Sequence, residues 1–512
     1  MTNFRPHRPQ KHFFKSFKFC HIHPIIFSLY PALGLLASNF GHTAIFDVIR
    51  PLAFSFLISI FIFFIVRLII PNWNKAAIIT TLLLVIFFGF GHLYDTLKTT
   101  TILNISIGRI RYLLPTIFVF TAILIIVILK SRRLNYSNLF ITFSSIVLVV
   151  YSLSHITKLK LSEDHVRKLA DQSQFDTENT NEVFNGVKRD IYYIILDAYT
   201  RDDHLLSEFQ FDNSEFLSEL EDLGFYIARC SQPNYPSTAL AMASTLNFEY
   251  LDSLAPDIIN NNYSWVNFKP YIDNNRTTQF FQNLGYTYIT AQTSFDWINN
   301  PNSDIYLRRY TIGGAIIELT AFETMFLNST IFRSVKGIDF LPNIKNVATY
   351  EESHYETILS TLDKMDKIIA ISGPKFSYIH IAVPHRPYIF TPEGDFFITE
   401  DPSVGYINNI QFINNQIIPV LKDLISKSEP APIIIVQGDH GHGSSSNFIL
   451  NAYYLPNGMD TTLYSTISPV NTFRLLMDNY FGTSLGLLDD ISYTWKYGDV
   501  YKFGIAADDC HR

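Results

Sequence analysis

The sequence predicts a bundle of about five transmembrane helices followed by an α/β domain, in which helices cover both faces of a mostly parallel sheet. Three observations support this prediction. Five long apolar runs fall within the first 155 residues. From residue 190 onward, apolar strand-like runs alternate with amphipathic helix-like segments. Charged residues make up only 17% of the chain, which is low for one soluble domain of 512 residues.

The five apolar runs have the length of membrane spans. They lie at 22–40, 51–70, 76–93, 113–130 and 136–155. Each is close to the roughly 20 residues that a helix needs to cross the hydrocarbon core. A cleaved signal peptide is the alternative for the first run, but no small-residue cleavage site clearly follows it and further runs come after it. We therefore expect residues 1–155 to form a transmembrane domain.

Basic residues predict the orientation of these spans. They gather in the N-terminal tail, around the loop between the second and third runs, and after the fourth run: Arg5, Arg8, Lys11, Lys15, Lys18, Arg67, Lys75, Lys130, Arg132 and Arg133. The positive-inside rule places all of these in the cytoplasm. Arg109 and Arg111, before the fourth run, conflict mildly with this assignment. With about five spans, the remainder of the chain then lies outside a plasma or inner membrane.

The rest of the chain divides into a connector and one large domain. Residues 156–189 are polar and mixed in charge, which predicts a juxtamembrane linker with room for a surface helix at 157–170. Residues 190–512 form the extracytoplasmic domain. The net charge of −7 gives no indication of a nucleic-acid partner. The three cysteines do not make a disulfide framework, and whether Cys230 and Cys510 pair in the outer compartment is left open.

Within 190–512, strands and helices are expected in alternation. The expected strands are 190–196, 225–230, 286–291, 376–382, 431–437 and 449–455. The expected helices are 213–223, 237–247, 276–284, 351–371, 403–426 and 468–481. Continuous apolar strands between amphipathic helices are typical of a parallel sheet that is covered on both faces. Ligands of such folds bind at the carboxyl ends of the strands.

Polar side chains follow three of these strands. Asp197 comes directly after the first strand, and Asp439-His440 lies between glycines in "GDHG" after a late one. His380 lies within a third strand and His385 just past it. Carboxylate and imidazole ligands suit zinc, manganese or a similar divalent ion. Asp197, Asp439 and His440 are therefore the predicted metal ligands.

A hydroxyl is the candidate for a fourth ligand. In "PNYPSTALAMASTLN" (233–247), a turn leads into an apolar helix that begins near Ser237-Thr238. A metal ion lowers the pKa of a bound hydroxyl, and a helix N-terminus binds phosphate oxygens. The simpler interpretation is that Ser237 or Thr238 only caps the helix. For Asp197 a turn or cap role is also open, and for His380 a buried structural role is favoured over a catalytic one.

These motifs, in this order, resemble the sulfatase-like branch of the alkaline phosphatase superfamily. The resemblance rests on Asp197 after the first strand, the hydroxyl that heads the next helix, "PHRPY" (384–388) and "GDHG" (438–441). With its membrane anchor, the chain is similar in plan to lipoteichoic acid synthases and lipid A phosphoethanolamine transferases. The resemblance covers about 190–480.

The resemblance implies roles for individual residues. Asp197, Asp439 and His440 match metal ligands, and Thr238 matches a nucleophile that also contacts the metal, with Ser237 as the alternative. His385 matches a histidine that contacts the transferred phosphate or the leaving group. His442 stands where the phosphoethanolamine transferases carry an acidic residue, so it becomes a possible substrate contact, and one or two metal ions are both open. Mn²⁺ and Zn²⁺ both fit this set.

The implied function is metal-dependent transfer of a phospho-group, of phosphoglycerol or phosphoethanolamine type, through a phospho-threonine. The donor would be a lipid phosphodiester in the membrane, and the acceptor an envelope glycan or lipid. "CSQPN" at Cys230 departs from the sulfatase motif, and Ala198 replaces the second of two expected aspartates, which disfavours a sulfatase. A sulfatase-like hydrolase, acting on phosphodiesters or sulfuric esters, and a non-catalytic envelope scaffold are the alternatives.

Residues 293–350 carry no motif that assigns a role. They are expected to form a lid or a groove near the membrane and to influence substrate choice. Arg308 and Arg309 are candidates for contact with a lipid phosphate, although a solvated basic turn is the simpler interpretation.

Overall fold

The computed structural model describes residues 19–510 except 42, 44, 99, 103–104, 107, 173–185, 261–267, 296, 310–316, 335–346, 400, 444–445, 497–498 and 508–509. The chain divides into two compact units. The first comprises Met1–Lys160 and Leu319–Val347, and the second comprises Leu161–Glu318 and Ala348–Arg512.

The first unit is built from apolar helices that coincide with the five predicted runs. They are α1 (His23–Ser38), α2 (Ile49–Ile69), α3 (Trp73–Leu97), α4 (Ile110–Lys130) and α5 (Asn135–Gln172). Within the described part of the chain, four are long and apolar enough to cross a membrane: α2 together with the 3-10 turn before it, α3, α4 and α5. α1 is shorter, with 16 residues. The unit thus has four helices of spanning length and a shorter fifth.

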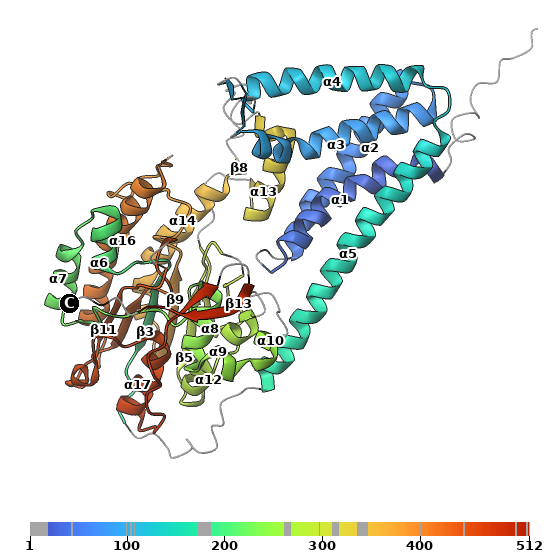
Figure 1. The fold of residues 1–512 in the computed structure, drawn as a ribbon. Helices are drawn as coiled ribbons and strands as arrows, with labels where there is room; N and C mark the ends of the chain where they lie inside the picture. Colours follow the sequence, from blue (N-terminus) through green and yellow to red (C-terminus); the bar gives the residue numbers. More distant parts are fainter. Residues whose placement is uncertain are drawn as a thin grey trace, which may run out of the picture. The chain divides into compact units, whose positions relative to one another are not determined.

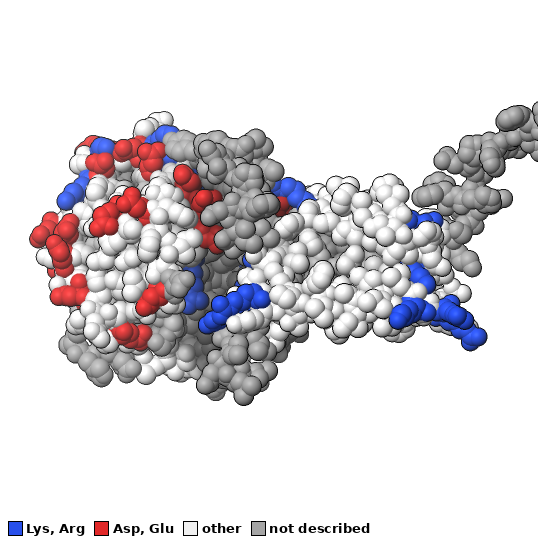
Figure 2. Space-filling model, turned by 90° about the horizontal axis from the view of Figure 1, so that it is seen from above, with Lys and Arg blue, Asp and Glu red and all other residues white. Residues whose placement is uncertain are grey.

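Basic loops of this unit lie together at one end. The guanidinium of Arg67 lies 4.5 Å from the ring centroid of Trp73, at the start of α3. Lys75 Nζ donates a hydrogen bond to the carbonyl of Leu129, which places the α2–α3 loop beside the α4–α5 loop. Figure 2 shows the helical unit nearly free of charged side chains between basic groups near its ends. The basic N-terminal tail, Arg5 to Lys18, lies outside the described residues.

A segment from the second half of the sequence packs in this helical unit. It contains α13 (Ala321–Ser329) and a 3-10 turn, Ile331–Ser334. Phe322 and Phe326 are buried in a core with residues of α1, α2 and α3. Gly91 of α3 allows the close approach, because a Cβ there would collide with the Asn328 carbonyl. The segment Leu319–Val347, expected within 190–512, therefore belongs to the first unit.

α5 continues without a break into the predicted linker. It runs to Gln172, whereas the last apolar run ends at 155. Val166 and Ala170, one helical turn apart, are buried in a core of the second unit. The expected surface helix at 157–170 is thus the end of α5, held by these two contacts. The predicted linker at 156–189 is helical over its first half, and 173–185 lies outside the described residues.

The second unit contains a seven-stranded sheet, ordered β4-β11-β10-β3-β9-β5-β6. Its strands are β3 (Ile191–Leu196), β4 (Tyr226–Ile227), β5 (Thr287–Ala291), β6 (Ile305–Leu307), β9 (Lys375–Ile381), β10 (Ile433–Gln437) and β11 (Asn451–Tyr454). The five strands from β10 to β6 are mutually parallel, and β11 is antiparallel to β10 and β4. β3, β9 and β10 are buried along their whole length, as strands covered on both faces must be.

Helices cover both faces of this sheet (Figure 1). One face packs against α8 (Thr238–Asn247), α12 (Arg276–Asn283) and α17 (Pro469–Phe481). The other packs against α7 (Ser214–Asp222), α14 (Tyr350–Asp363) and α16 (Pro402–Lys427). Shorter elements are α6 (Asp202–Phe209), α9 (Leu251–Leu254), α10 (Pro256–Asn260), α11 (Lys269–Asp273), α15 (Met365–Ile369), β12 (Tyr493–Lys496) and β13 (Asp499–Ile505). The predicted fold class is confirmed.

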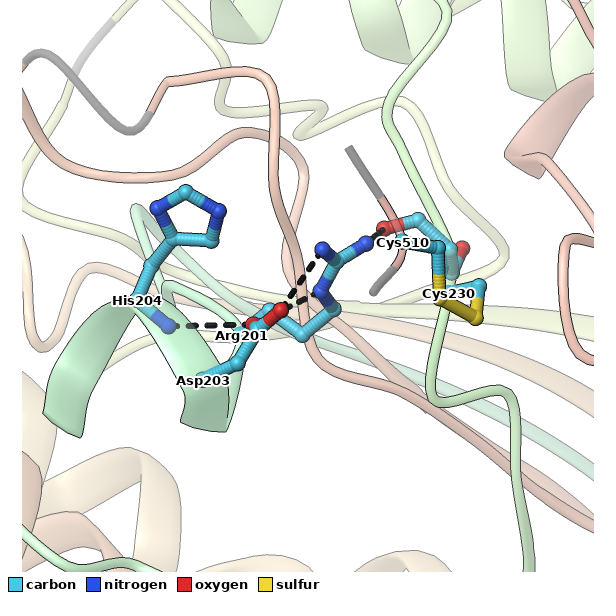
Figure 3. Close-up of a disulfide and its surroundings, with 6 residues drawn as sticks. Arg201, Asp203, His204, Cys230 and Cys510 are labelled. Atoms are coloured by element: carbon cyan, nitrogen blue, oxygen red, sulfur yellow. Dashed lines mark hydrogen bonds and ion pairs between the residues drawn. A yellow bond between two sulfur atoms is a disulfide. The ribbon is translucent and has the colours of Figure 1, made fainter. Parts of the chain in front are cut away.

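A disulfide joins the end of the chain to the loop after β4. Cys230 and Cys510 are bonded, with their Cα atoms 5.4 Å apart (Figure 3). Close by, the buried guanidinium of Arg201 pairs with both carboxylate oxygens of Asp203 at 2.8 Å and donates to the Ser231 carbonyl. The pairing that the sequence left open is therefore present in the fold. Disulfides persist mainly in oxidising compartments.

Candidate metal centre and catalytic site

Three predicted ligands meet at the carboxyl end of the sheet. Asp197 follows β3, and Asp439 and His440 follow the neighbouring parallel strand β10. One ligand atom from each of the three lies within 4.8 Å of the others. His440 Nε2 is 3.7 Å from Asp197 Oδ1 and 3.6 Å from Asp439 Oδ2. These distances would allow one cation to contact all three side chains.

The backbone locks the two carboxylates together. Ala198 adopts a φ of 63°, a left-handed conformation that is uncommon outside glycine. From there its N–H donates to Asp439 Oδ1 at 3.0 Å. Gly438 makes this approach possible, because a Cβ at this position would lie 2.6 Å from the Tyr199 carbonyl oxygen. Ala198, next to Asp197, thus holds the Asp439 carboxylate, and Gly438, next to Asp439, leaves room for the Tyr199 carbonyl.

Two carboxylate oxygens of this group lack the partners that buried charged atoms need. Among the described residues, Asp197 Oδ1 and Asp439 Oδ2 are buried without a hydrogen-bond partner. Each carboxylate holds its other oxygen in a hydrogen bond, Asp197 Oδ2 with His380 at 3.1 Å and Asp439 Oδ1 with Ala198. Burying an ionised oxygen without a partner costs free energy, and a cation bound between these two oxygens would remove that cost. The residues therefore fit a divalent metal.

The electrostatics agree with an ionised Asp197 carboxylate. Burial alone would raise the pKa of Asp197, but His385, His380 and His440 outweigh it and hold that pKa below its usual range. Burial alone would lower the pKa of His440, but Asp439 and Asp197 outweigh it and raise that pKa. The Asp197 carboxylate therefore keeps its negative charge at neutral pH.

Thr238 reaches this cluster from the start of α8. Its Oγ1 lies 3.2 Å from His440 Nε2. Ser237 is the N-cap residue, yet its hydroxyl makes no capping hydrogen bond and is buried without a partner among the described residues. The first-turn N–H groups of α8 therefore have no side-chain cap, and the positive end of the helix faces the cluster. The capping interpretation of these two hydroxyls is wrong in this structure.

His385 lies at the edge of the same cluster. Its backbone N–H donates to the Asp197 carbonyl at 3.0 Å. Its ring Nδ1 donates to the Arg386 carbonyl at 2.8 Å, so Nε2 is the ring nitrogen that this bond does not use. The ring centroid is 6.3 Å from that of His440 and 5.0 Å from that of Phe295. This half-buried imidazole borders the three predicted ligands and is not one of the group that could hold an ion.

His442 lies in an aromatic setting beside the cluster. Its Nε2 is 2.7 Å from the Tyr388 hydroxyl, and its ring stacks on Tyr406 at 4.2 Å. Its backbone N–H donates to Thr200 Oγ1 at 2.7 Å. Burial and the nearby Arg386 lower the pKa of His442 to about 4, so the imidazole is neutral at neutral pH.

The structure thus brings together every residue that the sequence predicted for the metal group: Asp197, Asp439, His440 and Thr238. Sequence reasoning did not assign partners to His380, which contacts Asp197 directly. It also missed Tyr388, whose signal is its place in "PHRPY" three residues after His385. Arg308 lies in the second unit, where its carbonyl accepts a hydrogen bond from Lys364 Nζ.

Cys230 cannot serve as a sulfatase nucleophile in this fold. Its sulfur is bonded to Cys510. Conversion to formylglycine requires a free thiol or hydroxyl, so this chemistry is closed to Cys230. Thr238 and Ser237 remain as the hydroxyls next to the ligand cluster.

Comparison with known proteins returns solved structures of distant similarity. The integral membrane protein lipooligosaccharide phosphoethanolamine transferase A from Neisseria meningitidis is 12% identical, with a TM-score of 0.41, covering 90% of this chain and 95% of its own. The C-terminal periplasmic domain of EcEptC from Escherichia coli, in complex with Zn, is 11% identical, with a TM-score of 0.41, covering 64% and 94%.

The lipoteichoic acid synthase LtaP from Listeria monocytogenes is 10% identical, with a TM-score of 0.37, covering 62% of this chain and 83% of its own. No family model and no curated protein matches. The solved structures are of the kinds that the order of motifs resembles. Their TM-scores lie below 0.5, and the activities named for them are properties of those proteins.

Proposed function

We propose that this chain is a membrane-anchored, metal-dependent transferase that moves a phospho-group from a lipid phosphodiester to an envelope glycan or lipid. The observation that supports it most is the position of Thr238 Oγ1, 3.2 Å from a metal-ligand nitrogen and at an uncapped helix N-terminus. The proposed nucleophile, the proposed cation site and the N-terminus of α8, which can bind an anion, are then all in contact. That combination is what phosphoryl transfer through a covalent intermediate requires.

We assign metal binding and phosphate binding to different groups of the site. Asp197, Asp439 and His440 would hold the ion, which is Mn²⁺ or Zn²⁺ by the chemistry of its ligands. When bound, such an ion supplies positive charge that lowers the pKa of a neighbouring hydroxyl and stabilises phosphate oxygens. The first-turn N–H groups of α8 add donors for those oxygens.

The transfer takes two steps. In the first, Thr238 Oγ1 loses its proton to water and forms a bond to phosphorus, while the bond from phosphorus to the lipid oxygen breaks. The leaving diacylglycerol oxygen takes up a proton, which we propose comes from Nε2 of the cationic His385 ring and leaves that ring neutral. In the second, an acceptor hydroxyl gives its proton to His385 Nε2 and bonds to phosphorus, and the Thr238 oxygen is released and takes up a proton from water. His442 and Ser237 are the proposed contacts to the transferred group.

The proposed location is an inner or plasma membrane, with the catalytic unit on its outer side. Four helices of spanning length support a membrane protein. The Cys230–Cys510 disulfide supports an oxidising compartment for the second unit. The basic loops gathered at one end of the helical unit support a cytoplasmic position for that end.

The test is a product analysis with the full-length protein in detergent and a phospholipid labelled in its head group, phosphatidylglycerol and phosphatidylethanolamine in turn. We expect diacylglycerol release that stops after chelation and returns with Mn²⁺ or Zn²⁺. The label should pass to an added glycan or lipid acceptor. Label that is found only in a free water-soluble phosphoester, with or without acceptor, would identify a hydrolase. No release with either donor and either metal would contradict the proposal.

A further inference from the structure

Two consecutive hydrogen bonds link Asp197 to His380 and His380 to Tyr378. His380 Nε2 lies 3.1 Å from Asp197 Oδ2, and the Tyr378 hydroxyl lies 3.0 Å from His380 Nδ1. All three side chains are buried, at 0% exposed for Asp197, 3% for His380 and 4% for Tyr378. The two hydrogen bonds therefore lie entirely in the protein interior and connect the tyrosine hydroxyl to the aspartate carboxylate through the imidazole.

The sheet holds this arrangement rigidly. Tyr378 and His380 are two residues apart in β9, so their side chains project from the same face. β9 pairs in parallel with β3, with His380 opposite Ile195 and Ile381 opposite Leu196. Asp197, the residue after β3, also donates its N–H to the Ile381 carbonyl at 3.0 Å. The ligand and its support are thus fixed on adjacent central strands.

The hydrogen-bond inventory determines what His380 does. In the neutral imidazole, the Nε2 proton is donated to the Asp197 carboxylate, and Nδ1 accepts the Tyr378 proton. Both ring nitrogens are then used, so neither offers a lone pair to an ion. The bond to Oδ2 directs the other oxygen, Oδ1, toward His440 Nε2 at 3.7 Å. Oδ1 is the atom without a hydrogen-bond partner among the described residues.

We propose that His380 and Tyr378 are positioning residues of the metal centre, which set the orientation of Asp197 without binding the ion themselves. This inference rests on the proposed function, because it presupposes that Asp197 binds a metal. Ligating carboxylates are commonly held by such outer hydrogen bonds, whose loss costs about 10- to 100-fold in metal affinity. The histidine within β9, expected from sequence to be structural, thereby acquires a functional role.

The experiment measures metal affinity of full-length protein in detergent after chelator treatment, by titration with Mn²⁺ and with Zn²⁺. His380→Ala should weaken binding about 10- to 100-fold. His380→Gln should restore most of it, because a glutamine amide N–H reaches the position of Nε2. Tyr378→Phe should fall between wild type and His380→Ala, because Nδ1 loses its donor while Nε2 keeps its acceptor.

Tyr193→Phe is the matched control. Tyr193 is a buried tyrosine of β3, and its hydroxyl donates to Gln437 at 2.6 Å rather than to His380. This variant removes an equivalent buried hydroxyl and should leave metal affinity at the wild-type value. Thermal unfolding of every metal-free variant shows whether the fold survives, and only folded variants are compared.

The outcomes separate two failures. If the wild type binds neither ion, the proposed function fails, and the positioning role fails with it. If the wild type binds metal and folded His380→Ala binds it equally tightly, the positioning role alone is wrong. If His380→Gln loses the ion altogether while it stays folded, His380 is itself a ligand, which also overturns the inference.

Discussion

The hydroxyl oxygen Oγ1 of Thr238 lies 3.2 Å from Nε2 of His440, although the two residues are 202 positions apart in sequence. One residue begins a helix and the other follows a central strand. Their meeting places a nucleophile candidate at the ion site and at the positive end of α8.

Removing the Thr238 hydroxyl should stop turnover. Thr238→Ala should lower kcat at least about 100-fold, because the covalent step loses its nucleophile. Thr238→Ser keeps a hydroxyl and should retain measurable activity. The measurement is diacylglycerol release by purified protein, with bound metal determined in parallel.

Ser237→Ala is the control for this experiment. Ser237 is the adjacent hydroxyl and makes no hydrogen bond among the described residues. Its loss should change KM more than kcat, because its proposed role is contact with the transferred group. If Ser237→Ala were inactive and Thr238→Ala active, the nucleophile would be Ser237.

Metal should stabilise the wild type and not a ligand variant. An ion present at 100 times its Kd adds about 2.7 kcal/mol to the free energy of unfolding. Chelation should therefore lower the Tm of the wild type. Asp439→Asn keeps the side-chain shape but removes a charge from the site, so its Tm should barely respond to chelator. Equal shifts in both proteins would mean that the ion binds elsewhere.

The number of free thiols should show that Cys230 and Cys510 form a disulfide in cells while Cys20 stays reduced. Cys230 and Cys510 are bonded, and Cys20 is predicted to lie at the cytoplasmic end of the first apolar run. A maleimide that adds a large mass should label one cysteine in denatured protein from intact cells and three after reduction. Cys230→Ser should raise the unreduced count to two, counting Cys510 as newly free. Three labelled thiols without reductant would argue against an oxidising compartment.

The contact of α13 with α2 should be energetically small but measurable. Arg50 contacts both oxygens of Glu323, at 2.5 and 2.7 Å, and its side chain is 56% exposed. Fully exposed ion pairs contribute about 0.2–1 kcal/mol, and the Glu323 side chain is only 5% exposed, so a double-mutant cycle of Arg50→Ala and Glu323→Ala should give a coupling at or above the upper end of that range. High salt should weaken it.

The pair Lys427–Asp423, within α16 and well exposed, serves as the comparison. It should show a smaller coupling in the same assay. An equal coupling for both pairs would mean that Arg50–Glu323 adds nothing specific to the docking of α13.

His354 should make the fold sensitive to acid. It is fully buried, and burial together with His385 lowers its pKa from 6.5 to about 3. Between these two values the unfolded chain binds a proton that the folded chain does not, so stability is complete above pH 6.5 and falls as the pH drops. Each pH unit in this window costs at most about 1.4 kcal/mol.

His354→Asn keeps an acceptor for the Ser294 hydroxyl, which donates to Nδ1 of His354. This variant should show a shallower fall in Tm between pH 6.5 and 4 than the wild type does. His165→Asn, on the exposed side of α5, should keep the wild-type slope. Identical slopes for all three proteins would exclude His354 as a source of the acid sensitivity.

Much of the fold was predictable because each element has a local signal. The apolar strands β3, β9 and β10 and the amphipathic helices between them lie within a few residues of their expected positions. The metal ligands followed from the rule that parallel strands end at one edge of a sheet. The meeting of Asp197 and Asp439 could therefore be predicted from sequence position alone.

What escaped prediction depends on tertiary contacts. The continuation of α5 depends on Val166 and Ala170, whose spacing is visible but whose partners are not. The position of α13 depends on the contact of its buried side chains with α1, α2 and α3, which lie more than two hundred residues earlier in the sequence. The partners of His380 required the register of β9 against β3, which no short motif encodes.

The most direct test of the central claim is the mass of the peptide that carries Thr238. Full-length protein is loaded with Mn²⁺ or Zn²⁺, mixed with the lipid donor in the absence of acceptor, quenched in acid and digested. The account predicts a phospho-group bound to Thr238 in the wild type and none in Thr238→Ala, with an added mass that identifies the transferred group. An unmodified Thr238 peptide from a preparation that binds metal and releases diacylglycerol would contradict transfer through a phospho-threonine.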